Sequence, residues 1–91
     1  MTAHYVASIR RDGRSHRRRI KVLIIPLDDD LTQYLERRMG REVEVVLENA
    51  VIRCRVTRDD GAVALRPDEE GRRKILGILR RGRRFVRVSL L

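Results

Sequence analysis

Residues 42–67 read EVEVVLENAVIRCRVTRDDGAVALRP, and their pattern predicts three consecutive antiparallel strands. Apolar Val43, Val45 and Leu47 alternate with glutamates, so one face of the first strand is apolar and the other is mostly acidic. We expect Asn49-Ala50 and Asp60-Gly61 to form the two tight turns of this meander. The turns predict the cross-strand pairs Leu47 with Ile52, Val45 with Cys54, Val43 with Val56, Glu44 with Arg55, Arg58 with Val63 and Val56 with Leu65.

The flanking segments predict three further strands. Residues 5–11 and 17–25 are rich in β-branched residues and are joined through Asp12-Gly13, which is typical of a hairpin that ends at Pro26. Residues 85–91 alternate again, with Val86, Val88 and Leu90 on one face and Arg87 on the other. That apolar face at the end of the chain is also a possible contact between subunits.

Two helices are expected, each beginning at a run of acids that suits the positive end of the helix dipole. The first begins at Asp28-Asp29-Asp30 and ends at Gly40, with Leu31, Tyr34, Leu35 and Met39 at helical spacing. The second follows Pro67 and the acids 68–70 and ends at Gly82. Its apolar side holds Ile75, Leu76, Ile78 and Leu79, and its cationic side holds Arg73, Lys74, Arg80 and Arg81.

These elements predict one α+β domain over residues 1–91. Its antiparallel sheet would consist of the hairpin, the three-strand meander and the C-terminal strand, covered by the two helices. No apolar run approaches the roughly 20 residues that span a bilayer, and the N-terminus lacks a signal-peptide core, so we expect a soluble, cytoplasmic protein. A chain this short is near the lower limit for a single core, and we therefore expect a dimer or higher oligomer.

The positive charge of the chain is concentrated in two segments. Twenty of the 91 residues are arginine, two are lysine, and the net charge is +9. Residues 10–21 carry +6 and residues 72–87 carry +8, whereas residues 22–71 between them carry −5. Charge placed in this way is typical of a protein that binds a polyanion.

The arginines of the middle segment and those of the two basic segments differ in their expected partners. Arg53 and Arg55 have glutamates across the predicted hairpin, so we expect them to be neutralised there. Residues 17–19 and 80–84 have no acids nearby in the sequence, and unpaired like charges repel unless a partner neutralises them. Arginine suits phosphate, because its planar fork can bind two oxygens and stack on a base.

Catalysis, cofactors and metals find little support in the residue types present. The only histidines are His4 and His16, and no glycine spacing matches a P-loop or dinucleotide site. The three acids from Asp28 point in different directions on a helix and are expected to cap it rather than bind a metal. Cys54 is a single cysteine on an apolar strand face and is expected in the core. We expect no enzyme, no cofactor and no metal.

The favoured function is therefore sequence-tolerant binding of single-stranded DNA, with DNA preferred to RNA. No helix-turn-helix, zinc or zipper pattern indicates a duplex reader, whereas sheets with cationic grooves suit single strands. Tyr5 and Phe85 are candidates for base stacking, although Phe85 could equally lie in the core. The expected binding residues are Arg10, Arg11, Arg14, Arg17, Arg18, Arg19, Arg73, Arg80, Arg81, Arg83, Arg84, Arg87, Tyr5 and Phe85.

Two family resemblances bear on this choice. The Arg-rich hairpin at residues 10–21, the meander and the cationic stretch 72–87 resemble the layout of the ThermoDBP-related single-stranded DNA-binding proteins of hyperthermophilic archaea. The scarcity of Asn and Gln beside abundant charge is also typical of a thermophile, although a GC-rich genome would favour arginine too.

The first half of the chain is similar to the swapped-hairpin AbrB pattern, through Asp12-Gly13-Arg14, Ile25-Pro26, Gly40 and residues 42–49. It carries ten residues, Ser15 to Ile24, where that family has only a few. This resemblance implies an alternative function, a duplex-binding regulator acting as a dimer. A third alternative is a small assembly subunit that docks on structured RNA or on an acidic protein.

Overall fold

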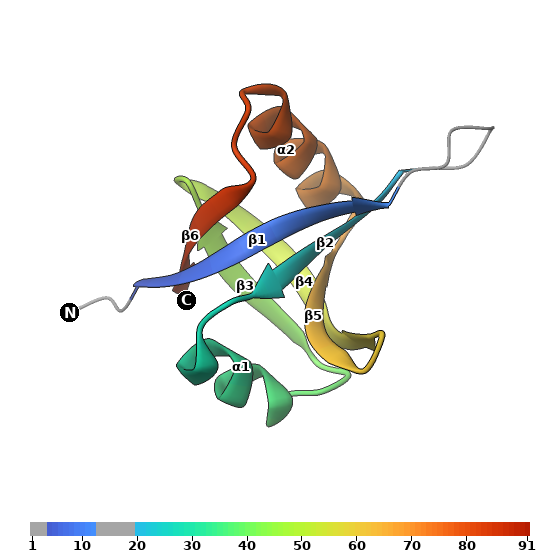
Figure 1. Cartoon of the computed structure of the whole chain (residues 1–91), viewed down its shortest axis with the longest axis vertical. Helices are drawn as coiled ribbons and strands as arrows, with labels where there is room; N and C mark the ends of the chain where they lie inside the picture. Colours follow the sequence, from blue (N-terminus) through green and yellow to red (C-terminus); the bar gives the residue numbers. More distant parts are fainter. Residues whose placement is uncertain (1–3, 13–19) are drawn as a thin grey trace.

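Alternating apolar and polar residues form the six strands of the computed structural model, which describes residues 4–12 and 20–91 (Figure 1). The order of the elements along the chain is β1 (His4–Asp12), β2 (Lys21–Pro26), α1 (Asp29–Glu36), β3 (Glu42–Leu47), β4 (Ala50–Asp59), β5 (Ala62–Pro67), α2 (Glu69–Arg80) and β6 (Phe85–Leu90). The described strands pair in the order β1-β2-β5-β4-β3-β6 and close into an antiparallel barrel.

The expectation of an open sheet covered by two helices is wrong, because the sheet closes on itself. Strand β6 pairs with β1 on one side and with β3 on the other, and β2 pairs with β5, so each described strand has a neighbour on both sides. Alternation of inward and outward residues is the same in a one-sided sheet and in a barrel wall. The sequence pattern therefore could not distinguish the two.

The helices lie at opposite ends of the barrel rather than over one sheet face (Figure 1). Leu31 and Leu35 of α1 are fully buried, as are Ile75 and Ile78 of α2, and all four belong to the same core cluster as the inward strand residues. A closed wall shields that core from the sides, so the helices reach it through the open ends. Neither helix in the described chain is long and apolar enough to cross a membrane.

Acidic residues begin both helices, as the sequence predicts. The Asp28 carboxylate accepts a hydrogen bond from the Asp30 N–H at 2.9 Å, and the Asp68 carboxylate accepts one from the Gly71 N–H at 2.7 Å. Helix α1 ends at Glu36, earlier than predicted, and Met39 lies beyond it with 37% of its surface exposed.

The predicted turn between β3 and β4 is wrong by one residue. Glu48 and Asn49 occupy the turn, with positive φ angles of 46° and 73°, so the cross-strand pairs shift by two residues. A shift of two leaves every side chain on its predicted face, because the period of a strand is two. The observed pairs are Leu47 with Ala50, Val45 with Ile52, Val43 with Cys54, Glu44 with Arg53 and Glu42 with Arg55.

The predicted register of the next hairpin is confirmed. Arg58 pairs with Val63 and Val56 pairs with Leu65, while Asp60-Gly61 forms the turn with φ angles of 51° and 78°. The pairing of β1 with β2 is also confirmed, but Asp12 lies in β1 opposite Lys21 instead of in a turn. Gly13 and the predicted start of the second strand at residues 17–19 lie outside the described residues.

Two glycines of α2 should respond to alanine in opposite directions. A Cβ at Gly71 would lie 2.7 Å from Cγ2 of buried Ile52 and 3.2 Å from the Pro67 Cβ, whereas a Cβ at Gly77 would meet no described atom within 4 Å. We expect Gly71→Ala to destabilise the fold by about 1–3 kcal/mol through overpacking. Gly77→Ala should stabilise it by about 0.5–1 kcal/mol, because alanine favours helix. Urea unfolding measures both, and shifts of the same sign would contradict the packing seen around Gly71.

Candidate nucleic-acid interface

One side of the barrel presents apolar side chains outward. Ser8 of β1 pairs with Ile25 of β2 on one side and with Phe85 of β6 on the other, and Val6 pairs with Arg87. The Leu27 N–H donates to the Val6 carbonyl at 3.0 Å, which extends the same row. We call this surface the outer face of β1; it consists of Val6, Ser8, Ile25, Leu27, Phe85 and Arg87.

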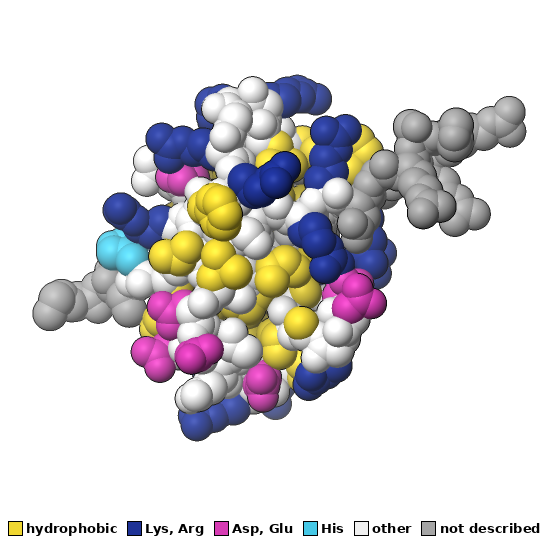
Figure 2. All heavy atoms as spheres, in the orientation of Figure 1, with side chains coloured by type: hydrophobic (Ala, Val, Ile, Leu, Met, Phe, Trp, Pro, Cys, Tyr) yellow, Lys and Arg dark blue, Asp and Glu magenta, His cyan; other side chains and the backbone are white. Residues whose placement is uncertain are grey.

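The outer face of β1 leaves large apolar groups in contact with solvent. Phe85 is 64% exposed, and Val6 and Leu27 are each 52% exposed. In Figure 2, hydrophobic side chains gather in the middle of the side that carries β1, with Lys and Arg side chains above them and Asp and Glu side chains below and to the left. Exposed apolar side chains gathered on one face mark a candidate binding surface.

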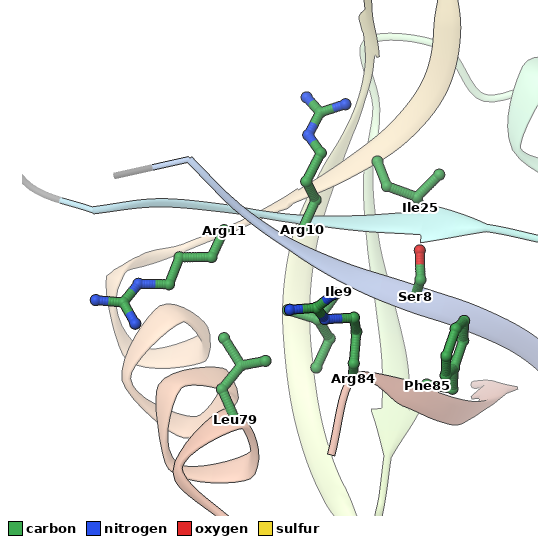
Figure 3. Close-up of a pocket in the computed structure, with 8 residues that line it drawn as sticks. All are labelled: Ser8, Ile9, Arg10, Arg11, Ile25, Leu79, Arg84 and Phe85. Atoms are coloured by element: carbon green, nitrogen blue, oxygen red, sulfur yellow. The ribbon is translucent and has the colours of Figure 1, made fainter. Parts of the chain in front are cut away.

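A pocket of about 660 Å³ adjoins this face, where β1 passes α2 and the chain entering β6. Its lining residues come from all of these segments and from β2: Ser8, Ile9, Arg10, Arg11, Ile25, Leu79, Arg84 and Phe85. Figure 3 shows that Arg10 and Arg84 lie on opposite sides of the β1 ribbon. Among the residues whose side chains are described, three arginines and no carboxylate line this pocket.

The fold brings parts of the two basic segments together. Arg10 and Arg11 of the first segment line the pocket together with Arg84 and Phe85 of the second, more than seventy positions away in the sequence. Arg87 lies on the outer face of β1, opposite Val6. Four other expected binding residues do not line the pocket: Arg73 and Arg80 of α2, and Arg81 and Arg83 between α2 and β6. Arg14, Arg17, Arg18 and Arg19 lie outside the described residues.

Some of the expected binding arginines are held by carboxylates. Arg10 forms an ion pair with Asp59, whose other oxygen lies 3.2 Å from the Lys21 Nζ. Arg83 pairs with Glu48 at 3.0 Å, and Arg73 lies 3.9 Å from a Glu69 oxygen. Within the described chain, the expected binding residues that form no ion pair are Arg11, Arg80, Arg81, Arg84 and Arg87, all of them exposed.

The aromatic candidates differ in their placement. Phe85 shares its outward orientation with Arg87, two residues further along β6, and its ring is exposed. Tyr5 faces inward and packs, partly buried, against the core. Tyr34 also packs there, with the Arg38 guanidinium 3.6 Å from the centre of its ring. Of these rings, Phe85 is the one available for stacking.

The apolar partners of Phe85 were missed in the sequence. Val6 and Phe85 both stand at positions that the alternation of their strands assigns to the outside, since their neighbours Ala7 and Val86 are buried. Apolar residues at outward positions were the available signal. No signal in the sequence places Ile25 and Leu79 near Phe85, because their proximity depends on how β2 and α2 pack against β1.

The opposite side of the barrel carries mixed charges. Arg55 and Arg66 lie directly opposite each other on β4 and β5, and both line a smaller depression of about 300 Å³ together with Glu42 and Asp68. Arg55 pairs with Glu42 at 3.6 Å, as expected of a middle arginine, and Glu44 lies opposite Arg53 rather than Arg55. The acids make this side a poorer anion site and a suitable location for control substitutions.

No cluster of side chains suited to holding a metal ion is found in the described residues. No three His, Cys, Asp or Glu side chains of residues 4–11 and 20–91 gather in a way that could hold a metal ion. His4 exchanges a hydrogen bond with Ser89 Oγ at 2.9 Å on the surface, and His16 lies outside the described residues. Comparisons with models of protein families, with curated proteins and with solved structures found no match.

The thiol of Cys54 should be inert in the folded protein. Burial, together with the nearby negative charge of Asp68, raises the pKa of Cys54 to about 12. Because the thiolate is the reactive form, we expect iodoacetamide to leave Cys54 unmodified at mildly alkaline pH. Concentrated urea should allow rapid alkylation, measured by mass spectrometry. Fast alkylation of the folded chain would contradict the burial of this side chain.

Proposed function

We propose that this protein binds single-stranded nucleic acid on the outer face of β1, with Phe85 stacking on a base and arginines holding the phosphates. The observation that carries the proposal is the exposed ring of Phe85, which lies between Arg84 of the adjoining pocket and Arg87 of the same face. Neither arginine pairs with a described carboxylate. Aromatic platforms beside cationic side chains are how proteins hold single strands without reading their sequence.

The geometry of β6 supports this arrangement. Phe85 and Arg87 are two residues apart on one strand, so their side chains leave the same face about 7 Å apart. A base stacked on the ring would therefore have a guanidinium within reach of the adjoining backbone. Stacking of one base on an aromatic side chain is worth about 1–3 kcal/mol, which is more than one exposed ion pair contributes.

A single strand suits this face better than a duplex. The faces of bases in a duplex are covered by their neighbours in the stack, so an exposed Phe85 could not lie flat against them. The phosphates of a single strand follow its path across a surface, and the unpaired arginines lie on both sides of the ring. A duplex would use the arginines alone and leave the apolar patch of Val6, Leu27 and Phe85 in water.

The salt dependence of binding should identify the phosphate contacts. For single strands, the slope of log affinity against log salt is about −0.7 per phosphate neutralised. We expect the double variant Arg84→Gln/Arg87→Gln to weaken binding of an oligothymidylate and to reduce that slope by about 1.4. The control is Arg53→Gln/Arg66→Gln, which removes the same charge from the opposite side of the barrel. Equal loss of slope in both variants, or affinity that is independent of salt, would contradict the proposal.

Removal of the ring should weaken binding without unfolding the protein. We expect Phe85→Ala to lower the affinity for oligothymidylate by about 5- to 150-fold, the equivalent of one stacked base. Its thermal stability should change little, because the ring is already 64% exposed. Val51→Ala is the matched control, since Val51 is 45% exposed on β4 across the barrel. Fluorescence anisotropy measures both, and tighter binding to a competing duplex of the same length would argue against a single-strand binder.

A further inference from the structure

The pocket beside Phe85 is larger than stacking on an open surface requires. Its volume of about 660 Å³ lies inside the range of about 300–1,000 Å³ that is typical of small-molecule sites. Ile9, Ile25, Leu79 and Phe85 are its apolar lining residues. Figure 3 shows Leu79 and Phe85 on either side of Arg84, so apolar groups and a guanidinium face the same space.

The pocket also meets the edge of β1 that lies beyond its last described pair with β6. Strand β6 pairs with β1 as far as Ser8, and beyond it the Ile9 N–H donates to the Arg84 carbonyl at 2.8 Å. Backbone groups alternate along an antiparallel strand, so the Arg11 N–H points to the same edge as the Ile9 N–H. Residues 81–83, which precede Arg84, connect it to α2 and do not continue along β1. The Arg11 N–H is therefore directed toward the pocket.

We propose that this pocket takes one unstacked nucleobase of the bound strand, with an adjoining phosphate against the guanidinium of Arg84. This inference rests on the proposed function, but it goes further than stacking on an exposed ring. The base would lie against Leu79 and Phe85, and its polar edge would accept a hydrogen bond from the Arg11 N–H.

The residues that line the pocket favour a nucleotide over other small ligands. A free phosphate would leave the apolar lining residues unused, and an acyl chain would leave the Arg11 N–H without a partner. A nucleobase joined to a phosphate suits the apolar lining, the Arg11 N–H and the Arg84 guanidinium, because it has apolar faces, a polar edge and an anionic group. The absence of lining carboxylates among the described residues removes the main source of repulsion.

Amide chemical shifts can locate the base directly. Addition of thymidine monophosphate to the whole protein should shift the amide resonances of Arg11, Leu79 and Arg84 saturably. Those of Val51 and Arg53, on β4, should not move. The oligothymidylate should produce the same shifts at lower concentration. If the oligonucleotide moves only Phe85 and Arg87, the strand binds the outer face and leaves the pocket empty, which would overturn this inference and leave the proposed function standing.

A variant that fills the pocket provides the second test. Ser8 lies between Ile25 and Phe85, so Ser8→Phe places a ring in the pocket and leaves every arginine intact. We expect it to abolish the shifts caused by thymidine monophosphate and to lower the oligothymidylate affinity roughly tenfold, with the salt slope unchanged. Thr57→Phe, at an outward and half-buried position of β4, is the matched control, and thermal unfolding checks that both variants are folded.

The outcomes separate the two proposals. A Ser8→Phe protein that binds thymidine monophosphate and the oligonucleotide as tightly as the parent would overturn the base pocket alone. An abasic oligonucleotide that binds the parent as tightly as oligothymidylate would overturn it as well, because only the base is missing. A parent protein that binds none of these probes at low salt would overturn the proposed function itself.

Discussion

The structure depends on the backbone hydrogen bonds by which β6 closes the barrel between β1 and β3. This pairing joins the last strand to the first and converts a sheet with open edges into a continuous wall. The wall encloses one apolar core, so the helices can bury their apolar sides only at the ends of the barrel. The same pairing places Phe85 beside Ser8 and Arg87 beside Val6, which creates the outer face of β1.

Closure of the barrel also brings basic and acidic residues from different parts of the sequence into contact. The basic and acidic blocks are separate in the sequence, but Arg10 and Lys21 meet Asp59, and Arg83 meets Glu48. Exposed or half-exposed pairs of this kind contribute only about 0–1 kcal/mol each, so they neutralise charge locally without adding much stability. Arg84 and Arg87, beside Phe85, form no ion pair with a described carboxylate, so their positive charge stays available where the aromatic ring is exposed.

Much of the local structure could be predicted, and the reasons are local. The Asp60-Gly61 turn, the cap at Asp68 and the inward residues of β4 follow from the chemistry of neighbouring residues along the chain. The turn before β4 was misplaced by one residue, because Glu48 adopts a positive φ that a sequence pattern would assign to Asn49 alone. The predicted register was wrong by two residues, an even number, so the prediction of which side chains share a face is still correct.

Sequence alone was sufficient for the strands, the helix starts, the buried faces and the concentration of arginine in two segments, because propensity, alternation and capping act between neighbours. Tertiary structure was needed for the closure of the barrel, the exposure of Phe85, the partial neutralisation of the arginines and the pocket between β1 and α2. Each of these depends on contacts between residues far apart in the chain, such as Ser8 with Phe85 or Arg83 with Glu48. Residue patterns within a segment do not specify which distant segment will pair with it, whereas the burial of one common core does.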